Sequence, residues 1–271
     1  MNKNPLIIVI GAYGSGKSEY AINLAKQLHK HDDWKSPLHH EICKSDSVFL
    51  VDLDIVNPYF RSRDVREQFE KEGITVIAPE SKYRNADIPM ISPMVKGAIM
   101  NLDKTVILDV GGDPAGSRAL ARFADDICKR PYIMQLVVNT KRPFTSNVEE
   151  IIIMKEKLEY TSKLKVTELI CNTNLMDLTD EKLITEGINI IKEVASKEAL
   201  IFDKYLVLND KDNTYPDTIQ GVSKINLEYF LMKPWEKATT PTPSLLKGNI
   251  GISTTPNHSS KACLATTEEK P

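Results

Sequence analysis

Short apolar, β-branched runs alternate with longer amphipathic stretches along the chain, from its first residues to about residue 232. Each apolar run is almost continuously hydrophobic, as expected for a strand that helices cover on both faces. The alternation indicates βαβ units and a parallel sheet. We therefore predict an α/β fold with a doubly wound, mostly parallel sheet of about seven strands.

The apolar runs predict the strands, and the amphipathic stretches predict the helices between them. The predicted strands cover residues 6–10, 47–52, 74–78, 105–110, 132–138, 167–171 and 201–208. The predicted helices cover residues 17–29, 62–72, 92–102, 117–126, 146–158, 179–196 and 216–231. Thr179 is the predicted N-cap of its helix, because acidic residues follow it in the first turn, where the helix dipole favours them.

From about Ala238 onward the chain is rich in Thr, Pro, Ser, Lys and Gly, and its apolar residues have no periodic spacing. Such a segment buries too little apolar surface to offset the entropy lost on ordering. We predict a folded domain over residues 1–237 and a disordered, low-complexity tail over residues 238–271.

Composition and charge narrow the function classes. The chain is 41% hydrophobic and 27% charged, so a large core can form without metals or disulfides. A formal net charge of -2 gives no support for binding to nucleic acid or to a membrane surface. The four cysteines have no zinc-ligand spacing and fit a reducing compartment.

The apolar run before Gly11 is too short for a signal-peptide core or a membrane span. Later windows also fall short of the ~18 continuous apolar residues that a membrane span needs. We predict a cytoplasmic protein without a membrane partner.

A phosphate-binding loop follows the first predicted strand. The strand runs into the pattern Gly11-x-x-x-x-Gly16-Lys17-Ser18, and a helical pattern follows. The backbone N–H groups of such a loop turn around phosphate oxygens, and the helix start adds its positive end. Lys17 is predicted to bridge the β- and γ-phosphates, and Ser18 to ligate Mg²⁺. The predicted nucleotide contacts of the loop are Gly11, Tyr13, Gly14, Ser15, Gly16, Lys17 and Ser18.

Acidic residues stand at the ends of two later strands. In a parallel sheet, carboxylates that serve phosphate chemistry are expected at the carboxyl ends of strands. Asp109 is the predicted magnesium ligand, and Gly112 supplies an amide toward the γ-phosphate. Asp52 and Asp54 add a magnesium contact or orient the attacking water, and the alternative is that one carboxylate of each motif caps a turn. The predicted catalytic residues are Lys17, Asp54 and Asp109, and the predicted metal ligands are Ser18, Asp52, Asp54 and Asp109.

The segments GAYGSGKS, VDLDIVNPYFR, ILDVGGDPAG and LICNTN together resemble the MinD/ParA/CobQ-type branch of P-loop ATPases, over roughly residues 5 to 235. The resemblance implies ATP and Mg²⁺ as cofactors, slow hydrolysis, a nucleotide-dependent homodimer, and a switch that acts on a partner protein. It also implies that Asn172 contacts adenine, since an amide both donates and accepts; a turn residue is the alternative. No N-K-x-D sequence supports guanine.

Two features depart from that branch. Ala12 stands where members with the deviant loop carry a signature lysine, which argues against lysine-clasped dimerisation. Cys128 has no suitably spaced partner for a bridging iron–sulfur cluster. Arginines follow both acidic motifs and form either a phosphate-sensing rim or the solvated faces of two helices. They are Arg61, Arg63, Arg66, Arg118 and Arg122.

The leading hypothesis is a magnesium-dependent ATPase that acts as a nucleotide switch on a partner protein, with metallocofactor maturation as one such role. The alternatives are a small-molecule kinase, whose acceptor would lie near Asp52 and Asp54, and a nucleotide sensor that does not hydrolyse. Binding to nucleic acid has no positive support in the composition.

Overall fold

The computed structural model describes residues 4–29, 48–54, 66–78, 93–112, 114–210 and 213–231. They all belong to one compact unit, Met1–Met232. The strands are β1 (Leu6–Gly11), β2 (Val48–Leu53), β3 (Thr75–Ile77), β4 (Thr105–Val110), β5 (Tyr132–Val138), β6 (Glu168–Cys171), β7 (Ile201–Leu208), β8 (Thr218–Ile219) and β9 (Val222–Leu227). The α-helices are α1 (Lys17–His29), α2 (Arg66–Lys71), α3 (Pro93–Met100), α4 (Pro114–Ala121), α5 (Ala124–Ile127), α6 (Val148–Ser162) and α7 (Glu181–Glu198).

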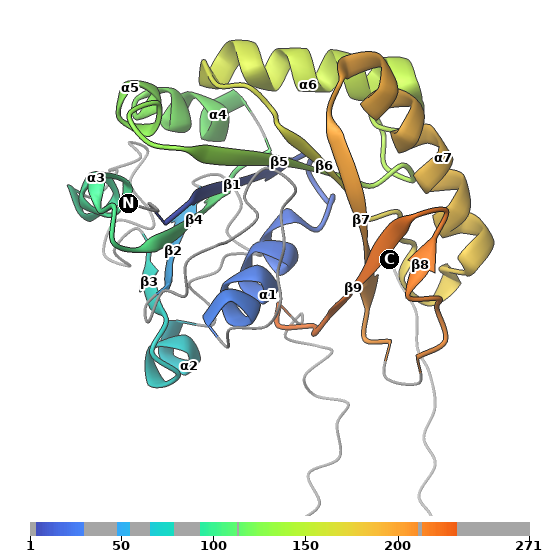
Figure 1. The fold of residues 1–271 in the computed structure, drawn as a ribbon, viewed down its shortest axis with the longest axis horizontal. Helices are drawn as coiled ribbons and strands as arrows, with labels where there is room; N and C mark the ends of the chain where they lie inside the picture. Colours follow the sequence, from blue (N-terminus) through green and yellow to red (C-terminus); the bar gives the residue numbers. More distant parts are fainter. Residues whose placement is uncertain are drawn as a thin grey trace, which may run out of the picture. The chain divides into compact units, whose positions relative to one another are not determined.

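The described strands form one sheet in the order β3-β2-β4-β1-β5-β6-β7-β9-β8 (Figure 1). Neighbouring strands run parallel from β3 to β9, and only the β8–β9 pair is antiparallel. This confirms the predicted α/β fold with a doubly wound, mostly parallel sheet. The sheet has nine strands rather than about seven, and each of the seven predicted strands is present within one residue of its predicted ends.

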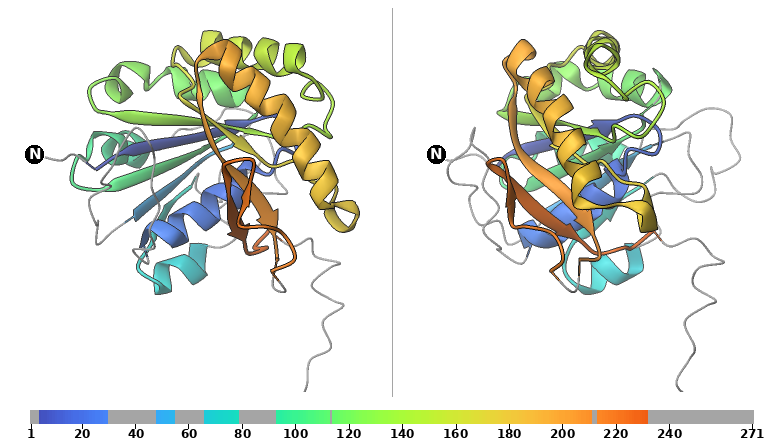
Figure 2. Two further views of the ribbon diagram at one scale, coloured as in Figure 1. Left: turned by 45° about the vertical axis from the view of Figure 1, so that its right-hand side comes forward. Right: turned by 90° about the vertical axis from the view of Figure 1, so that its right-hand side faces the viewer.

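Helices cover both faces of the sheet, which explains the nearly continuous apolar character of the strands. One apolar cluster joins the sheet to residues of α3 to α7, and the other joins it to α1, α2 and the residues after β9 (Figure 2). Alternate residues of β1 divide between the two: Leu6, Ile8 and Ile10 enter the first cluster, and Ile7 and Val9 enter the second. None of the described helices is long and apolar enough to cross a membrane.

The predicted helix at residues 216–231 is wrong, because β8 and β9 form a hairpin there. Gln220 and Gly221 have φ angles of 52° and 83°, the left-handed pair that a tight two-residue hairpin turn requires. Lys192 on α7 donates to the carbonyl oxygen of Gln220 at 2.6 Å. β9 then pairs in parallel with β7 and extends the sheet. Tertiary pairing therefore overrides the helical spacing of apolar residues in this segment.

Two helix predictions need smaller corrections. The predicted helix at 117–126 is two helices, α4 and α5, separated by a break after Ala121. The N-cap of α7 is Asp180, whose carboxylate accepts the N–H of Leu183 at 2.7 Å. The hydroxyl oxygen of Thr179 instead accepts the N–H of Leu175 at 2.9 Å. Asp and Thr both serve as caps, and the local sequence alone does not separate them.

The residues that follow β9 are fastened to α1. The carboxylate of Glu19 accepts the N–H groups of Phe230 at 2.5 Å and Leu231 at 3.1 Å. The side chain of Asn23 exchanges two hydrogen bonds with the backbone of Glu228, at 2.9 and 2.8 Å. Because α1 begins at Lys17, this contact anchors the helix that carries the predicted phosphate loop. The tail predicted for residues 238–271 lies outside the described residues.

Glu19 generates a prediction about stability and pH. Burial raises the pKa of Glu19 from 4.5 to about 7, although its bonds from Phe230 and Leu231 oppose that rise. A carboxyl group with a raised pKa in the folded state stabilises the fold below pH 4.5, and this contribution is lost as the pH rises to about 7. The free energy of unfolding of the wild type should therefore fall by up to about 3 kcal/mol across this range.

Glu19→Gln should remove this part of the pH dependence, because a neutral amide oxygen still accepts hydrogen bonds but does not titrate. Urea unfolding between pH 4.5 and 8 measures the free energy of unfolding of both proteins. Subtracting one value from the other removes the contribution of other titrating groups, such as Asp109. A wild-type minus variant difference that does not change with pH would contradict the burial of an ionisable Glu19.

Candidate functional site

The strand order reverses at β1, which has β4 on one side and β5 on the other. In open α/β sheets, ligands bind beyond the carboxyl ends of the strands at such a reversal. β1 ends at Gly11, where the predicted phosphate loop begins. Asp109 is the register partner of both Val9 on β1 and Asp52 on β2. The fold thus brings the loop and both acidic strand ends to one edge of the sheet.

The loop between β1 and α1 has the backbone that its glycines predict. Gly14 and Gly16 have φ angles of 73° and 85°. A Cβ atom on Gly16 would lie 2.2 Å from Nδ2 of Asn172, so only glycine fits there. The N–H of Ser15 donates to the carbonyl oxygen of Ala12 at 3.1 Å. Tyr13 is 72% exposed, so its side chain points into solvent and its backbone is the part that can line the loop.

Two side chains from other strands hold consecutive carbonyl groups of the loop. Nδ2 of Asn172, directly after β6, donates to the carbonyl oxygen of Ser15 at 2.6 Å. Nε of Arg142, in the loop after β5, donates to the carbonyl oxygen of Gly14 at 3.3 Å. Because a trans peptide points its N–H away from its C=O, holding the Ser15 carbonyl turns the N–H of Gly16 to the opposite side. That side is where a phosphate oxygen would be bound.

Lys17 lies in a buried cluster of charges. Its Nζ is 3.2 Å from Oδ2 of Asp54, and the two side chains are 7% and 3% exposed. The backbone N–H of Asp54 donates to Oδ1 of Asp52 at 3.0 Å. The structure therefore joins the predicted residues of the first acidic motif directly to the loop lysine.

Asp109 is the most deeply buried member of the cluster, with no exposed surface. Neither of its carboxylate oxygens has a hydrogen-bond partner among the described residues. Burial raises the pKa of Asp109 to about 6; the charge of Lys17 and the hydroxyl of Ser18 oppose this, and the charge of Asp54 adds to it. A wholly buried carboxylate is costly, so a cation bound beside Asp109 would stabilise its charged form.

The residues fit a magnesium ion that shares its ligands with a nucleotide. Mg²⁺ prefers oxygen ligands, keeps several waters, and takes only one or two carboxylates together with phosphates. Asp109 and the Ser18 hydroxyl are both at the loop and provide such oxygens. No group of three or more Asp, Glu, His or Cys side chains among the described residues is placed to hold a metal ion by itself. The cation would thus be held jointly with the phosphates.

Gly112 lies against the loop, as its predicted role requires. A Cβ atom at this position would be 2.0 Å from the carbonyl oxygen of Gly11 and 2.9 Å from the carbonyl carbon of Ala12. Both neighbours are backbone atoms that are fixed at the end of β1. Contact this close with the segment after β4 is possible only for glycine.

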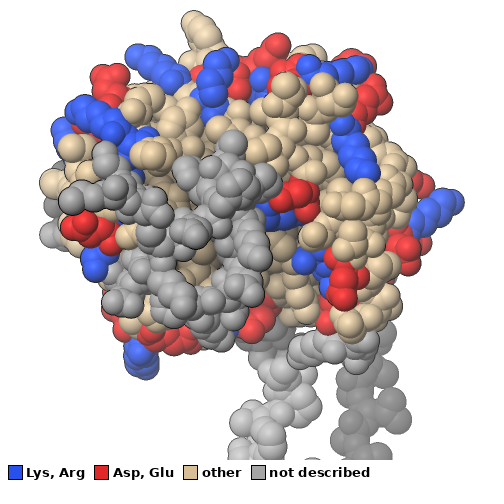
Figure 3. Space-filling model, viewed as in Figure 1, with Lys and Arg blue, Asp and Glu red and all other residues tan. Residues whose placement is uncertain are grey.

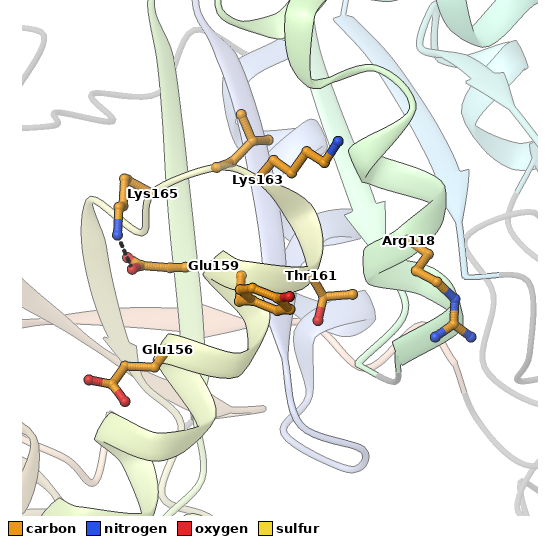
Figure 4. Close-up of a pocket in the computed structure, with 8 residues that line it drawn as sticks. Arg118, Glu156, Glu159, Thr161, Lys163 and Lys165 are labelled. Atoms are coloured by element: carbon orange, nitrogen blue, oxygen red, sulfur yellow. Dashed lines mark hydrogen bonds and ion pairs between the residues drawn. The ribbon is translucent and has the colours of Figure 1, made fainter.

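No hydrogen bond or ion pair joins the loop to the described arginines of the predicted rim, which are Arg66, Arg118 and Arg122. Arg66 donates to the carbonyl oxygen of Ala78 at 3.3 Å and lies 3.8 Å from Glu70. Arg118 lines a cavity of about 850 Å³ between α4 and the end of α6, opposite Thr161 and Lys163 (Figure 4). None of the predicted site residues lines that cavity. Arg61 and Arg63 lie outside the described residues, so their placement is untested.

Arg142 was missed by the sequence analysis. It lies in a polar turn, and no motif marks it; only the fold shows that the turn after β5 reaches Gly14. Asn172 was predicted to contact adenine, and its bond to Ser15 adds a second role without testing the first. Cys128 and Cys171 are both free thiols, exposed and buried respectively.

No protein-family model and no curated protein matches the chain. Among solved structures it is similar to the cell division protein FtsY of Thermotoga maritima, with 17% identity and a TM-score of 0.48, over 76% of this chain and 63% of that one. It is also similar to chloroplast FtsY of Physcomitrella patens, with 13% identity and a TM-score of 0.47, over 74% and 57%. A plasmid partition protein of Borrelia burgdorferi is 16% identical, with a TM-score of 0.42, over 72% and 100%.

The chain thus spans less than two thirds of the two FtsY chains. These similarities concern the arrangement of helices and strands. In this chain a G-x-x-x-x-G-K-S loop follows β1 of a doubly wound, mostly parallel sheet.

The close approach at Gly112 generates a prediction with a matched control. Gly112→Ala should destabilise the fold by about 1–3 kcal/mol, because the added methyl group meets backbone that cannot move aside. Gly97→Ala on α3 adds the same methyl group where nothing lies within 4 Å, so it should be neutral or stabilising, since alanine favours helix. Thermal unfolding of both variants measures this. Equal stability of the two variants would show that Gly112 does not contact the loop.

Proposed function

We propose that this chain is a magnesium-dependent ATPase that acts as a nucleotide switch on a partner protein. The observation that carries the proposal is the buried cluster of Lys17, Asp54 and Asp109, which lies at the mouth of the phosphate loop. Phosphoryl transfer needs positioning and charge stabilisation more than covalent help from the protein, and this cluster provides both.

Each residue has a definite part in the proposed reaction. The N–H groups of the loop hold phosphate oxygens, and Lys17 bridges the β- and γ-phosphates. Ser18 and Asp109 hold Mg²⁺, which when bound neutralises charge that develops on the phosphates. Asp52 and Asp54 orient the attacking water or add a contact to the hydrated cation. The N–H of Gly112 faces the γ-phosphate.

The ion pair between Lys17 and Asp54 supports a switch. The ammonium group that is 3.2 Å from Asp54 is the same group that a bound polyphosphate would attract. Nucleotide binding therefore competes with this ion pair for Lys17. Asp54 follows the last residue of β2, so loss of the pair changes what holds the chain at that strand end. Two alternative partners for one buried cation make a bistable element of the kind that switches use.

The geometry at Asn172 is compatible with the adenine contact that the resemblance implies. One N–H of its amide is bound to Ser15, and no described residue donates to its Oδ1. An available acceptor beside the loop fits the exocyclic amino group of adenine, although the N1–H and amino groups of guanine could also donate to it, so this residue does not choose between the two bases. ATP is the proposed nucleotide because the resemblance implies it.

The proposed partners are a protein that reads the switch, such as one in metallocofactor maturation, and a second copy of the chain that joins when nucleotide binds. Nucleic acid is not a proposed partner: the chain has a net charge of -2, and the visible described surface intersperses basic and acidic side chains (Figure 3). The proposed location is the cytoplasm.

Calorimetry with Mg²⁺-ATP, Mg²⁺-ADP and Mg²⁺-GTP, with light scattering on the same samples, tests the proposal. We expect binding, preference for ATP over GTP, a doubled mass with ATP, and slow hydrolysis without an added acceptor. Turnover that requires a small acceptor molecule would replace the switch with a kinase. Tight binding without any turnover would replace it with a sensor.

Lys17→Ala should lower the affinity for Mg²⁺-ATP by about 10- to 100-fold, because a charge-assisted contact to phosphate is lost. It should also lower stability by about 3 kcal/mol, since buried Asp54 loses its ion pair with Lys17. Adding Asp54→Asn should restore stability and leave the affinity low, which separates the two effects. Wild-type affinity in Lys17→Ala would reject the loop assignment.

Asp109→Asn should reduce magnesium-dependent hydrolysis more than nucleotide binding, because a neutral amide is a weaker ligand for Mg²⁺ than a carboxylate. The comparison is made as turnover against Mg²⁺ concentration, with the dissociation constant for ATP measured in parallel. Hydrolysis equal to that of the wild type at limiting Mg²⁺ would remove Asp109 from the metal site.

A further inference from the structure

Arg142 is a second cationic side chain at the phosphate loop, and no motif of the sequence assigns it a role. Its Nε donates to the carbonyl oxygen of Gly14 at 3.3 Å, and its guanidinium carbon lies 3.6 Å from the point where a Cβ on Gly14 would stand. The guanidinium group of Arg142 therefore lies in contact with the loop at Gly14. β1 and β5 are neighbours in the sheet, which is why this turn reaches the loop (Figure 1).

The turn that carries Arg142 is built to hold it in place. Oδ1 of Asn139 accepts the N–H groups of Lys141 at 3.0 Å and Asn174 at 3.3 Å, and its Nδ2 donates to the carbonyl oxygen of Asn174 at 2.9 Å. The hydroxyl of Thr145 donates to the carbonyl oxygen of Asn139 at 2.8 Å. Asn139 and Thr145 are each 2% exposed. The backbone on either side of Arg142 is thus fixed by buried hydrogen bonds.

The guanidinium group of Arg142 has no carboxylate partner among the described residues. No ion pair joins it to a described residue, whereas its neighbour Lys141 pairs with Glu186 at 3.2 Å. A guanidinium has five N–H donors and no acceptor, so the bond to Gly14 leaves several donors available at the rim of the loop. By contrast Lys17 is already paired with Asp54. Lys17 therefore has to leave its ion pair with Asp54 before it can bind another group, whereas Arg142 still has N–H donors available.

We propose that Arg142 is a nucleotide-positioning residue: by binding the Gly14 carbonyl oxygen from outside the loop, it holds the Gly14 peptide in the binding conformation. The inference deepens the proposed function and depends on it. Arg142 then binds the carbonyl oxygen of Gly14, and Asn172 binds the carbonyl oxygen of the next residue, Ser15. Both bonds come from outside the loop, so this part of the loop is pre-organised. A pre-organised loop loses less entropy on binding, so the contribution of Arg142 should appear mainly in affinity.

The test compares Arg142→Ala, Arg142→Lys and Lys141→Ala, the last as a control that removes one adjacent positive charge. The dissociation constant for Mg²⁺-ATP is measured by calorimetry, with kcat and KM for hydrolysis alongside. We expect Arg142→Ala to bind about tenfold more weakly, with KM raised more than kcat is lowered, because the loop is no longer held in its binding conformation. Arg142→Lys should recover part of the affinity, and Lys141→Ala should match the wild type.

Arg142 is exposed, so its removal should leave the melting temperature unchanged and the fold intact. Equal affinity of Arg142→Ala and Lys141→Ala would overturn the inference, as would a fall in kcat with unchanged affinity. Lys17→Ala in the same series separates a failure of the role of Arg142 from a failure of the proposed function. If Lys17→Ala loses ATP and Arg142→Ala does not, only the role of Arg142 fails; if neither loses ATP, the proposed function fails.

Discussion

The burial of charged groups around Lys17 is the constraint on which the site depends. One buried ammonium group faces Asp54 at 3.2 Å, and Asp109 is wholly buried within range of the same charge. Burial in a medium of low dielectric constant is costly for a carboxylate. This burial raises the pKa of Asp109 to about 6, although the charge of Lys17 opposes the rise. A divalent cation held with phosphates would offset that cost, which is why the proposed function pairs the two ligands.

This constraint explains why the loop is held so firmly on its other sides. The segment after β4 touches it at Gly112, where a side chain would meet the backbone of Gly11 and Ala12. Asn172 and Arg142 hold it from the ends of β6 and β5. α1 is anchored in turn by Glu19 and Asn23, which bind the backbone at residues 228–231. The loop is therefore pre-organised, as a site that stabilises charge has to be.

Local sequence predicted the features that local physics determines. The loop, the seven core strands and the bounds of α1 follow from glycine placement and hydrophobic periodicity, because each is decided within about ten residues. The carboxyl ends of β2 and β4 could be predicted to meet, since parallel neighbours bring their ends together. The hairpin β8–β9 was missed because pairing with β7 and contacts with α7 decide it. Arg142 was missed because only the tertiary fold places the turn after β5 beside Gly14.

The distribution of fixed and exchangeable contacts also shows where a nucleotide can change the protein. On the side of β5 and β6, the loop carbonyl oxygens accept hydrogen bonds from Asn172, which is neutral, and from Arg142, which has no carboxylate partner among the described residues. Phosphate binding does not compete for these two bonds. On the β2 side, Asp54 holds the loop through a cation that phosphate also attracts. Since a ligand moves an equilibrium only through a difference in its affinity for two states, the proposed switch would begin at the Lys17–Asp54 pair. In that proposal the strand end at Asp54 moves, and the side of the loop held by Arg142 and Asn172 stays in place.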